Sequence, residues 1–344
     1  MPRSEFADPH DQQLNEKIKD LISFDGSNVN SFEADLIGQI IWSSLRLLKE
    51  KHETAQIKLM TRAFKEMRYA YHIFNQHPYS RRISIFGSAR TPENHPDYLA
   101  AKEFGAEMAK KGWVCITGAA DGIMKAGLEG AQKESSFGLS IRLPFESPTS
   151  SFMAGDPKLI TFRYFFTRKL MFLSHSDAVA AFPGGVGTQD ELFEVLTLMQ
   201  TGKANIIPLV LIQGTGTYWN EWLHYFQVNL LDQGWVSPED LHLFYLAPSY
   251  QDALAHISKF YSRYHSSRYV KDLLVIRMLT PLNEEQIKML NEKFGKILLK
   301  SGDIYATPPL KEETDHLEMY RIAFEHNHMH FGSLRHMIDE INNF

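Results

Sequence analysis

Residues 183–191 read PGGVGTQDE and directly follow AVAAF, the apolar run at residues 178–182. That run has the length and composition of a buried strand, and the residues behind the glycines predict a helix over 189–200. Glycines at such a turn let the backbone approach a bound group closely. The start of the helix offers free N–H donors and the positive end of its dipole. The stretch therefore predicts a phosphate site on an α/β fold.

The glycine spacing at this turn differs from that of the common nucleotide-binding loops. It fits neither G-x-G-x-x-G nor G-x-x-x-x-G-K-[ST], which disfavours a dinucleotide dehydrogenase and a P-loop NTPase. A plain strand-to-helix turn is the alternative. Thr188 and Glu191 have capping-box spacing, so Glu191 could simply cap the helix. Both interpretations stay open at this point.

Outward from the turn, short apolar runs alternate with helical patterns. The predicted strands lie at 83–86, 113–117, 137–143, 159–162, 178–182 and 207–212, and the predicted helices at 98–111, 121–133, 166–175 and 189–200. This alternation is typical of βαβ units, in which helices cover both faces of a parallel sheet. We therefore expect an α/β fold with a Rossmann-like, doubly wound parallel sheet.

Two further predicted strands end in small residues. GSAR at 87–90 follows the first strand, and TGAADG at 117–122 ends the second. Ligands of such sheets bind outside the carboxyl ends of the strands. Three glycine-bearing turns at one edge favour a cleft over a coincidence of tight turns, which adds Gly87, Ser88 and Gly118 to the candidate binding residues.

The flanks of this core predict three segments: a helical N-terminal extension (1–80), the nucleotide-binding core (81–217) and a C-terminal extension of helices plus a strand (218–344). Residues 11–22 and 32–74 have helical patterns. An apolar stripe within the second pattern consists of Ile57, Met60, Phe64, Met67, Tyr71 and Phe74. A stripe of that length suggests packing on another helix, within the chain or across a homo-oligomer.

The C-terminal extension reads as mostly helical. Helical patterns cover 218–231, 250–264, 283–299 and 316–344, the third beginning at a capping box of Asn283 and Gln286, and one strand is expected at 273–279. This α+β flank and the N-terminal helices are expected to cover the sheet edges and the seam between subunits. The alternative is that they form a regulatory pocket or a lid.

Composition excludes several classes of protein. Hydrophobic residues make up 44% of the 344 residues and charged residues 22%, the balance of an ordinary globular protein, and the net charge of −5 suggests no nucleic-acid partner. Cys115, the single cysteine, lies in an apolar run and is expected to be a buried, inert thiol. No apolar run approaches the about 20 residues that span a bilayer, so we expect no membrane association and a cytoplasmic location.

PGGVGTQDE at 183–191, Arg168-Lys169 upstream and GSAR at 87–90 together resemble the LOG (Lonely Guy) family of phosphoribohydrolases, long called lysine decarboxylase-like. The resemblance covers residues 80–215, and every specified position of the motif P-G-G-x-G-T-x-x-E is matched. The flanks resemble a longer bacterial subgroup of pyrimidine/purine nucleotide 5′-monophosphate nucleosidases. At the second strand end the family usually has a Gly-Gly-Gly-x-x-G-like turn, whereas this chain has GAADG.

The resemblance implies a catalytic pair, Arg168 and Glu191, with Lys169 and Thr197 as substrate contacts. The phosphate cradle would consist of Gly184, Gly185, Gly187 and Thr188, with Val186 as a further substrate-binding residue. The implied reaction is hydrolysis of a nucleoside 5′-monophosphate, AMP-like or another purine or pyrimidine nucleotide, to free base and ribose 5-phosphate. A carboxylate beside the anomeric carbon can stabilise the positive charge that develops on the ribose. No metal or cofactor is implied.

Two other functions use the same features. A non-catalytic nucleotide or molybdenum-cofactor carrier could have this fold, but a pure binder does not need a carboxylate beside the sugar, so the Arg168 and Glu191 pair favours an enzyme. Lysine decarboxylation needs pyridoxal phosphate on a Schiff-base lysine. Lys169 adjoins an arginine on a predicted helix and has no evident partner for the pyridinium nitrogen, which disfavours that chemistry.

Several polar residues outside the motif admit a functional and a structural interpretation. The histidines His326, His328, His330 and His336 suggest a metal site, although their spacing favours a solvated or interface cluster. Arg163 and Tyr164 precede the helix of Arg168 and could contact substrate or simply pack; His175 is expected to pack. The basic residues Arg263, Arg268 and Lys271 could contact an anionic effector or be a solvated stretch.

Overall fold

The computed structural model describes residues 9–143 and 151–344, and the chain divides into two compact units, Met1–Glu66 and Met67–Phe344. In the first unit, helices α1 (Pro9–Phe24) and α2 (Phe32–Lys49) pack through a small apolar core that includes Ile18, Ile22 and Trp42. Helix α3 (Thr54–Asn75) begins in this unit and ends in the second. The expected helical segment 32–74 is therefore two helices, because Lys51 has a left-handed backbone, with φ of 56°.

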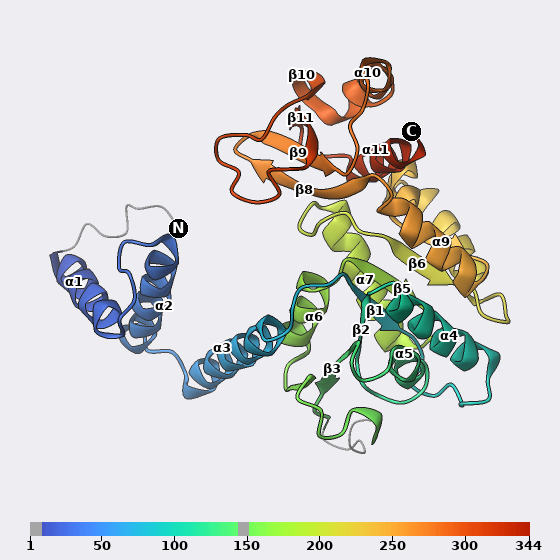
Figure 1. Cartoon of the computed structure of the whole chain (residues 1–344). Coiled ribbons are helices and arrows are strands. Elements are labelled where there is room, and N and C mark those ends of the chain that lie inside the picture. Colours follow the sequence, from blue (N-terminus) through green and yellow to red (C-terminus); the bar gives the residue numbers. More distant parts are fainter. Residues whose placement is uncertain (1–8, 144–150) are drawn as a thin grey trace. The chain divides into compact units, whose positions relative to one another are not determined.

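Within the described residues, seven strands of the second unit form one parallel sheet (Figure 1). They are β1 (Arg82–Phe86), β2 (Val114–Thr117), β3 (Ser136–Ile141), β4 (Leu159–Phe162), β5 (Ala178–Ala181), β6 (Leu209–Ile212) and β7 (Tyr245–Ala247). Their order is β4-β3-β2-β1-β5-β6-β7. This order confirms the expected Rossmann-like, doubly wound α/β fold.

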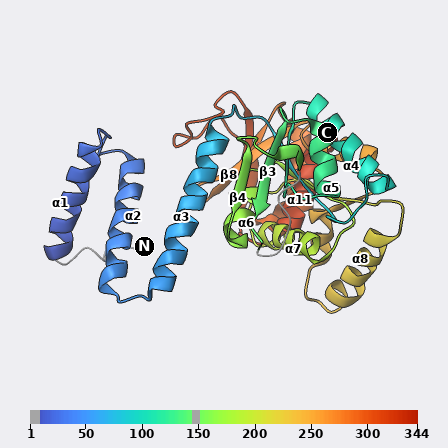
Figure 2. The same cartoon turned by 90° about the horizontal axis from the view of Figure 1, so that it is seen from below.

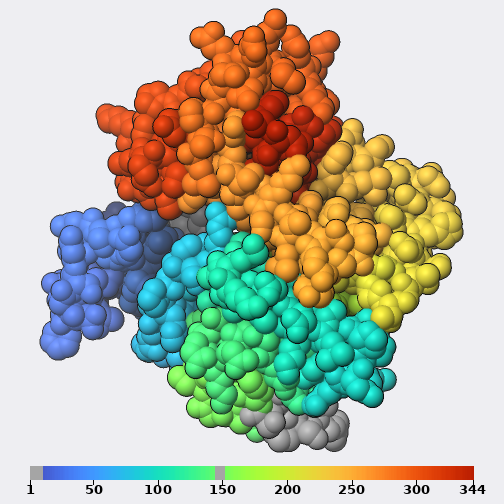
Figure 3. All heavy atoms as spheres, turned by 45° about the vertical axis from the view of Figure 1, so that its right-hand side comes forward, coloured from blue at the N-terminus to red at the C-terminus, as the bar shows by residue number. Residues whose placement is uncertain are grey.

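Helices cover both faces of this sheet because successive side chains of each buried strand point to opposite faces. They are α4 (Pro96–Lys110), α5 (Ile123–Ala131), α6 (Phe165–Ser174), α7 (Val186–Gln200), α8 (Tyr218–Phe226) and α9 (Tyr250–Phe260). Ile83 and Ile85 pack with α4, α5 and α9, two of which, α4 in teal and α9 in orange, lie side by side in Figure 3. Phe86 packs with α6, α7 and α8, and Figure 2 shows α6 beside α7.

The strand order reverses between β1 and β5, the two central neighbours of the sheet. Ile83 lies opposite Ala178 and Phe86 opposite Ala181, so the carboxyl ends of both strands reach the same edge side by side. In doubly wound folds, ligands bind at this reversal point. The glycine turn at 183–191 follows β5 directly and is therefore at the position where this fold places a ligand.

The C-terminal segment differs from the expectation. Its described residues form a four-stranded antiparallel sheet in the order β10-β11-β9-β8, made of β8 (Tyr264–Val270), β9 (Leu273–Met278), β10 (Leu299–Ala306) and β11 (Tyr320–His326). Helices α10 (Glu284–Leu298) and α11 (Phe331–Asn343) pack with it. Of these elements, β9, α10 with the capping box of Asn283 and Gln286, and α11 within the helical prediction for 316–344 were predicted. The helical prediction for 316–344 is wrong over β11, whose buried residues 321–324 lack the alternation of a half-exposed strand.

Two other expectations concern single features. Cys115 is completely buried, and burial raises the pKa of its thiol to about 12, as expected for an inert cysteine. Among the residues that the structure describes, no helix has both the length and the apolar character needed to cross a membrane.

Candidate active site

The glycine turn begins helix α7 earlier than the sequence predicts. The helix starts at Val186 and not at 189, with Gly185 as the N-cap residue. Thr188 and Glu191 consequently lie inside the helix, and Glu191 does not cap it. This removes the capping-box alternative. The N–H groups of Val186 and Gly187 precede the first hydrogen bonds of the helix, in which Thr188 and Gln189 donate to the carbonyl of Gly185 at 3.0 and 3.2 Å.

The glycines of the turn are needed for different reasons. A Cβ built on Gly184 would lie 2.2 Å from Oγ1 of Thr188 and 2.9 Å from the backbone nitrogen of Ser88, so packing within the protein requires glycine there. For Gly185 and Gly187, no atom of the described residues lies within 4 Å of such a Cβ, apart from the glycine, its chain neighbours and the nearby helix backbone. These two positions face open space, which leaves room for a bound group close to the backbone.

The structure brings the three predicted strand ends together. The Ser88 N–H donates to the carbonyl of Pro183 at 3.1 Å, which joins the turn after β1 to the turn after β5. A Cβ on Gly118, at the end of β2, would lie 3.8 Å from Nη1 of Arg168. Gly87 is closely packed, since a Cβ there would lie 2.5 Å from the Ile123 side chain. Gly87, Ser88 and Gly118 therefore line the edge that carries the glycine turn.

The departure from the family pattern at 118–122 has a visible consequence. Ala119 has a left-handed backbone, with φ of 53°, a conformation that favours glycine. Its N–H donates to Oγ1 of Thr117, and its methyl group packs with Leu128 and Met153. Compared with glycine, alanine adopts this backbone conformation less readily, but its methyl group gains apolar contacts at the turn.

Arg168, Lys169 and Glu191 form one buried ionic cluster between α6 and α7. Nη2 of Arg168 lies 3.5 Å from Oε1 of Glu191, and Nζ of Lys169 lies 3.4 Å from Oε2. The lysine ammonium also contacts Glu194 at 2.7 Å and Asp190 at 2.9 Å. The predicted catalytic pair is thus close in space, although it is separated by more than 20 positions in the sequence.

Aromatic packing keeps the arginine in place. Its guanidinium lies 5.3 Å from the ring centre of Phe165 and 5.5 Å from that of Phe172. Only 13% of the Arg168 side chain and 7% of the Glu191 side chain are exposed. Among the described residues, Nε of Arg168 is a buried donor without a hydrogen-bond acceptor.

The electrostatics of the cluster follow from its burial. Burial raises the pKa of the Glu191 carboxyl, and the positive charges of Lys169 and Arg168 only partly offset this effect. Burial also lowers the pKa of Arg168, against the attraction of Glu191. For Lys169 burial lowers the pKa, but hydrogen bonds to Glu194 and Asp190 outweigh it, so the net pKa is raised. The cluster therefore presents a carboxylate of increased basicity beside two cations.

Some predicted site residues lie away from this cluster. Thr197 is exposed and lies six positions beyond Glu191, about 9 Å further along the helix at its rise per residue. Val186 is 87% exposed at the start of α7. Tyr164 stacks on Phe166 with ring centres 5.6 Å apart, and Arg163 is exposed after β4. The structure therefore does not bring Thr197 and Val186 into the ionic cluster of Arg168, Lys169 and Glu191.

Sequence reasoning missed Tyr218 and Gln189. The Tyr218 hydroxyl donates to the carbonyl of Gly184 and accepts a hydrogen bond from Nε2 of Gln189 at 2.7 Å. Tyr218 begins helix α8, directly after QGTGT at 213–217. That segment is a fourth glycine-bearing strand end, of the same kind as the three that were used, so the signal was present in the sequence.

The remaining polar candidates are engaged within the protein. His175 stacks on Phe74 with ring centres 3.8 Å apart, and burial lowers the pKa of the imidazole to about 4, so its packing role is confirmed. His326 is fully buried, 2.7 Å from the Tyr269 hydroxyl, which makes the solvated interpretation wrong for this histidine.

Two of the basic residues proposed as effector contacts already have carboxylate partners. Arg268 pairs with Asp315 at 2.9 Å, and Lys271 pairs with Glu312. An anionic effector at Arg268 and Lys271 would therefore have to displace these carboxylates.

His336, another of the four histidines, stacks on His242 with ring centres 4.1 Å apart.

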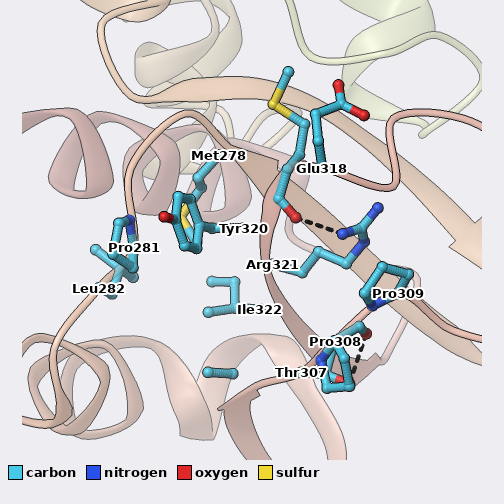
Figure 4. Close-up of a pocket in the computed structure, with 12 residues that line it drawn as sticks. Met278, Pro281, Leu282, Thr307, Pro308, Pro309, Glu318, Tyr320, Arg321 and Ile322 are labelled. Carbon is cyan, nitrogen blue, oxygen red and sulfur yellow. Dashed lines mark hydrogen bonds between the residues drawn. The ribbon is translucent and has the colours of Figure 1, made fainter.

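A hollow of about 460 Å³ lies in the C-terminal segment and not at the glycine turn (Figure 4). It is mostly apolar, lined by residues such as Met278, Pro308 and Tyr320. Its arginine, Arg321, is already used: the guanidinium donates to Glu313 at 3.0 Å and to the carbonyl of His316 at 2.7 Å. The other charged residue that lines the hollow, Glu318, is mostly exposed and lies 3.9 Å from His316, so the hollow offers no cation for a phosphate beyond the engaged Arg321.

The chain is similar to a known protein family. A family described as "Possible lysine decarboxylase" matches residues 108–257, which include the glycine turn and the ionic cluster. A cytokinin riboside 5′-monophosphate phosphoribohydrolase of Arabidopsis thaliana, LOG1, is 34% identical over 97 residues. That alignment covers 28% of this chain and 44% of the Arabidopsis protein, so the chain spans less than half of its length.

A bacterial relative aligns over more of its length. The cytokinin riboside 5′-monophosphate phosphoribohydrolase of Mycobacterium tuberculosis is 28% identical over 186 residues, 51% of this chain and 96% of that protein. Among solved structures, a molybdenum cofactor binding protein from Rippkaea orientalis is 21% identical with a TM-score of 0.39, covering 53% of this chain and 98% of that one. The molybdenum cofactor carrier protein of Chlamydomonas reinhardtii is 24% identical with a TM-score of 0.38, covering 53% and 98%.

Proposed function

We propose that this chain is a LOG-family phosphoribohydrolase, which hydrolyses the N-glycosidic bond of a nucleoside 5′-monophosphate to give free base and ribose 5-phosphate. The observation that carries the proposal is the buried Glu191 carboxylate beside Arg168 and Lys169. This cluster lies next to a helix start whose glycines leave open space. A protein that only binds a nucleotide needs the helix start to hold the phosphate, whereas cleavage of the glycosidic bond also needs the carboxylate.

The proposed reaction uses the site in two parts. The 5′-phosphate binds the first-turn N–H groups of α7, which supplies binding energy remote from the bond that breaks. Water adds to C1′ while the bond from C1′ to the base nitrogen breaks, and the bonding electrons leave with the base. Glu191 stabilises the positive charge on the ribose and accepts the proton of the water, which returns to the departing base. Arg168 anchors the nucleotide or assists the departing base.

The lysine of the cluster does not suit Schiff-base chemistry. Nζ of Lys169 has three carboxylates within 3.4 Å, from Asp190, Glu191 and Glu194. Hydrogen bonds to these groups hold the pKa of the ammonium above its ordinary value, whereas a Schiff base needs a neutral amine. A counter-ion for Glu191 is the role that these contacts support.

The direct test is base release by the purified protein across a panel of purine and pyrimidine monophosphates, followed by chromatography. Glu191→Gln is expected to lower the turnover by at least about 10²-fold while AMP still binds, since the amide keeps the shape but loses the charge. Glu194→Gln is the matched control, because it removes a carboxylate from the same helix at a position one turn away. Wild-type protein that binds AMP but releases no base would indicate a carrier.

The phosphate requirement is a separate prediction. Because the helix start is the main anchor, adenosine should have a far lower kcat/KM than AMP, chiefly through a raised KM. Steady-state rates with both compounds measure this difference. Equal kcat/KM values for AMP and adenosine would contradict a phosphate site at Gly185 and Gly187.

A further inference from the structure

Tyr218 holds the peptide group at the centre of the glycine turn. Its hydroxyl donates to the carbonyl oxygen of Gly184 and receives a hydrogen bond from Nε2 of Gln189, at 2.7 Å. These contacts tie α8 to the turn and to the first turns of α7. The tyrosine itself is fixed, since its ring meets the buried Trp219 edge-on, with centres 4.8 Å apart and an interplanar angle of 89°.

The hydrogen bond to Gly184 also orients a donor on the opposite side of the peptide. In a trans peptide the carbonyl and the following N–H point in opposite directions, and the described residues contain no cis peptide. With the Gly184 carbonyl held by Tyr218, the N–H of Gly185 points away from α8. Gly185 is the N-cap residue, and among the described residues no atom lies within 4 Å of a Cβ built on it.

The turn needs such a restraint because it contains two adjacent glycines. Glycine adopts many backbone conformations at little cost, so the peptide between Gly184 and Gly185 could rotate and present its carbonyl to an anion. Gly184 is closely packed on its Cβ side against Thr188 and Ser88, but that packing restrains its Cα and not the peptide plane. A hydrogen bond to the carbonyl restrains the plane itself.

We propose that Tyr218 is a positioning residue that orients the Gly184–Gly185 peptide for the 5′-phosphate, an inference that rests on the proposed function. It touches neither the phosphate nor the reacting atoms, and it acts through the Gly185 N–H. Loss of one neutral hydrogen bond corresponds to a roughly three- to tenfold weaker affinity. The loss should appear in KM with kcat nearly unchanged, since the phosphate is bound equally in ground and transition states.

The test compares Tyr218→Phe with Tyr225→Phe, which removes a hydroxyl from the exposed side of the same helix. Calorimetric titrations measure the affinity of each protein for AMP, ribose 5-phosphate and adenosine, and base release from AMP gives KM and kcat. Tyr218→Phe should weaken AMP and ribose 5-phosphate three- to tenfold, leave adenosine unchanged, raise KM and keep kcat. Tyr225→Phe should match the wild type throughout.

Three outcomes overturn the proposal: equal weakening of AMP and adenosine, unchanged phosphate affinity, or a loss confined to kcat. If Tyr218→Phe folds poorly, Gln189→Leu removes the donor to the same hydroxyl. It should also weaken the affinity for AMP and ribose 5-phosphate but not for adenosine, by a smaller factor. Wild-type protein that binds AMP without releasing base refutes the proposed hydrolysis, while the binding comparison still decides the role of Tyr218. Wild-type protein that binds no monophosphate refutes both.

Discussion

Gly184 and Gly187 occupy the same motif for different physical reasons, and substitution by alanine should separate them. Gly184→Ala would drive a methyl group into Thr188 and the Ser88 backbone, so we expect a loss of about 1–3 kcal/mol in the free energy of unfolding. Gly187→Ala meets open space and improves helix propensity, so stability should stay equal or rise by up to about 1 kcal/mol. AMP affinity should nevertheless fall, because the new methyl group occupies the phosphate space.

Urea denaturation and AMP titration of both variants measure these effects. The wild type and Gly216→Ala, another glycine with open space around it, serve as references. Normal AMP affinity in Gly187→Ala would place the phosphate elsewhere.

The raised pKa of Glu191 predicts the acid limb of the pH profile. Hydrolysis needs the ionised carboxylate, so kcat/KM should fall as the pH drops through the pKa of Glu191, which burial holds above the ordinary glutamate value. Lys169 lowers that pKa by its charge. Lys169→Met should therefore move the acid limb to higher pH. Profiles of wild type and variant measure the shift, and a limb that stays in place or moves to lower pH would contradict this assignment.

The antiparallel sheet depends on one buried carboxylate. Arg277 of β9 lies directly opposite Arg321 of β11, an arrangement that repels unless a counter-ion joins the two. Glu313 accepts from Arg277 at 2.7 Å and from Arg321 at 3.0 Å, and its side chain is fully buried. Glu313→Gln leaves the buried Arg321 without its carboxylate partner and Arg277 with only the half-exposed Asp315, and we expect a loss of about 3–5 kcal/mol of stability.

Thermal and urea denaturation measure this loss. Base release at low temperature checks that the parallel sheet, which carries the candidate site, remains folded. Asp315→Asn is the control, because Asp315 pairs with Arg277 but is 51% exposed and should cost less than about 1 kcal/mol. Equal stability of the two variants would show that the buried carboxylate is not needed for the sheet.

The chain as a whole is predicted to form a homo-oligomer, at least a dimer. On helix α3, Met60, Phe64 and Tyr71 expose 37%, 44% and 42% of their surface, which is unusual for an apolar stripe on a single helix. Light scattering at micromolar concentration should give at least twice the mass of one chain. Phe64→Glu should lower that mass, whereas Thr61→Glu adds the same charge beside the stripe and should leave it unchanged. A monomeric wild type would contradict the prediction.

Local patterns were enough to predict six of the seven strands described in the parallel sheet, whereas β7 was not predicted. Strands β1, β2 and β5 are short apolar runs followed by small residues, and parallel strands buried on both faces differ in composition from the helices between them. The same reasoning predicted the site edge at Gly87, Gly118 and the glycine turn. Arg168 and Glu191 came from the resemblance, because no periodicity relates two residues on different helices.

By itself the sequence determined six strands of the parallel sheet and the edge that carries the glycine turns, because each depends on neighbours along the chain; β7 came only from the structure. Only the tertiary structure decided whether Glu191 caps a helix, since the start of α7 depends on contacts between Gly184 and the Ser88 turn. It also decided the antiparallel sheet and the contact of Tyr218 with Gly184, across 34 positions. Strand pairing and such contacts join segments far apart in the chain, and their energy depends on partners that no local pattern specifies.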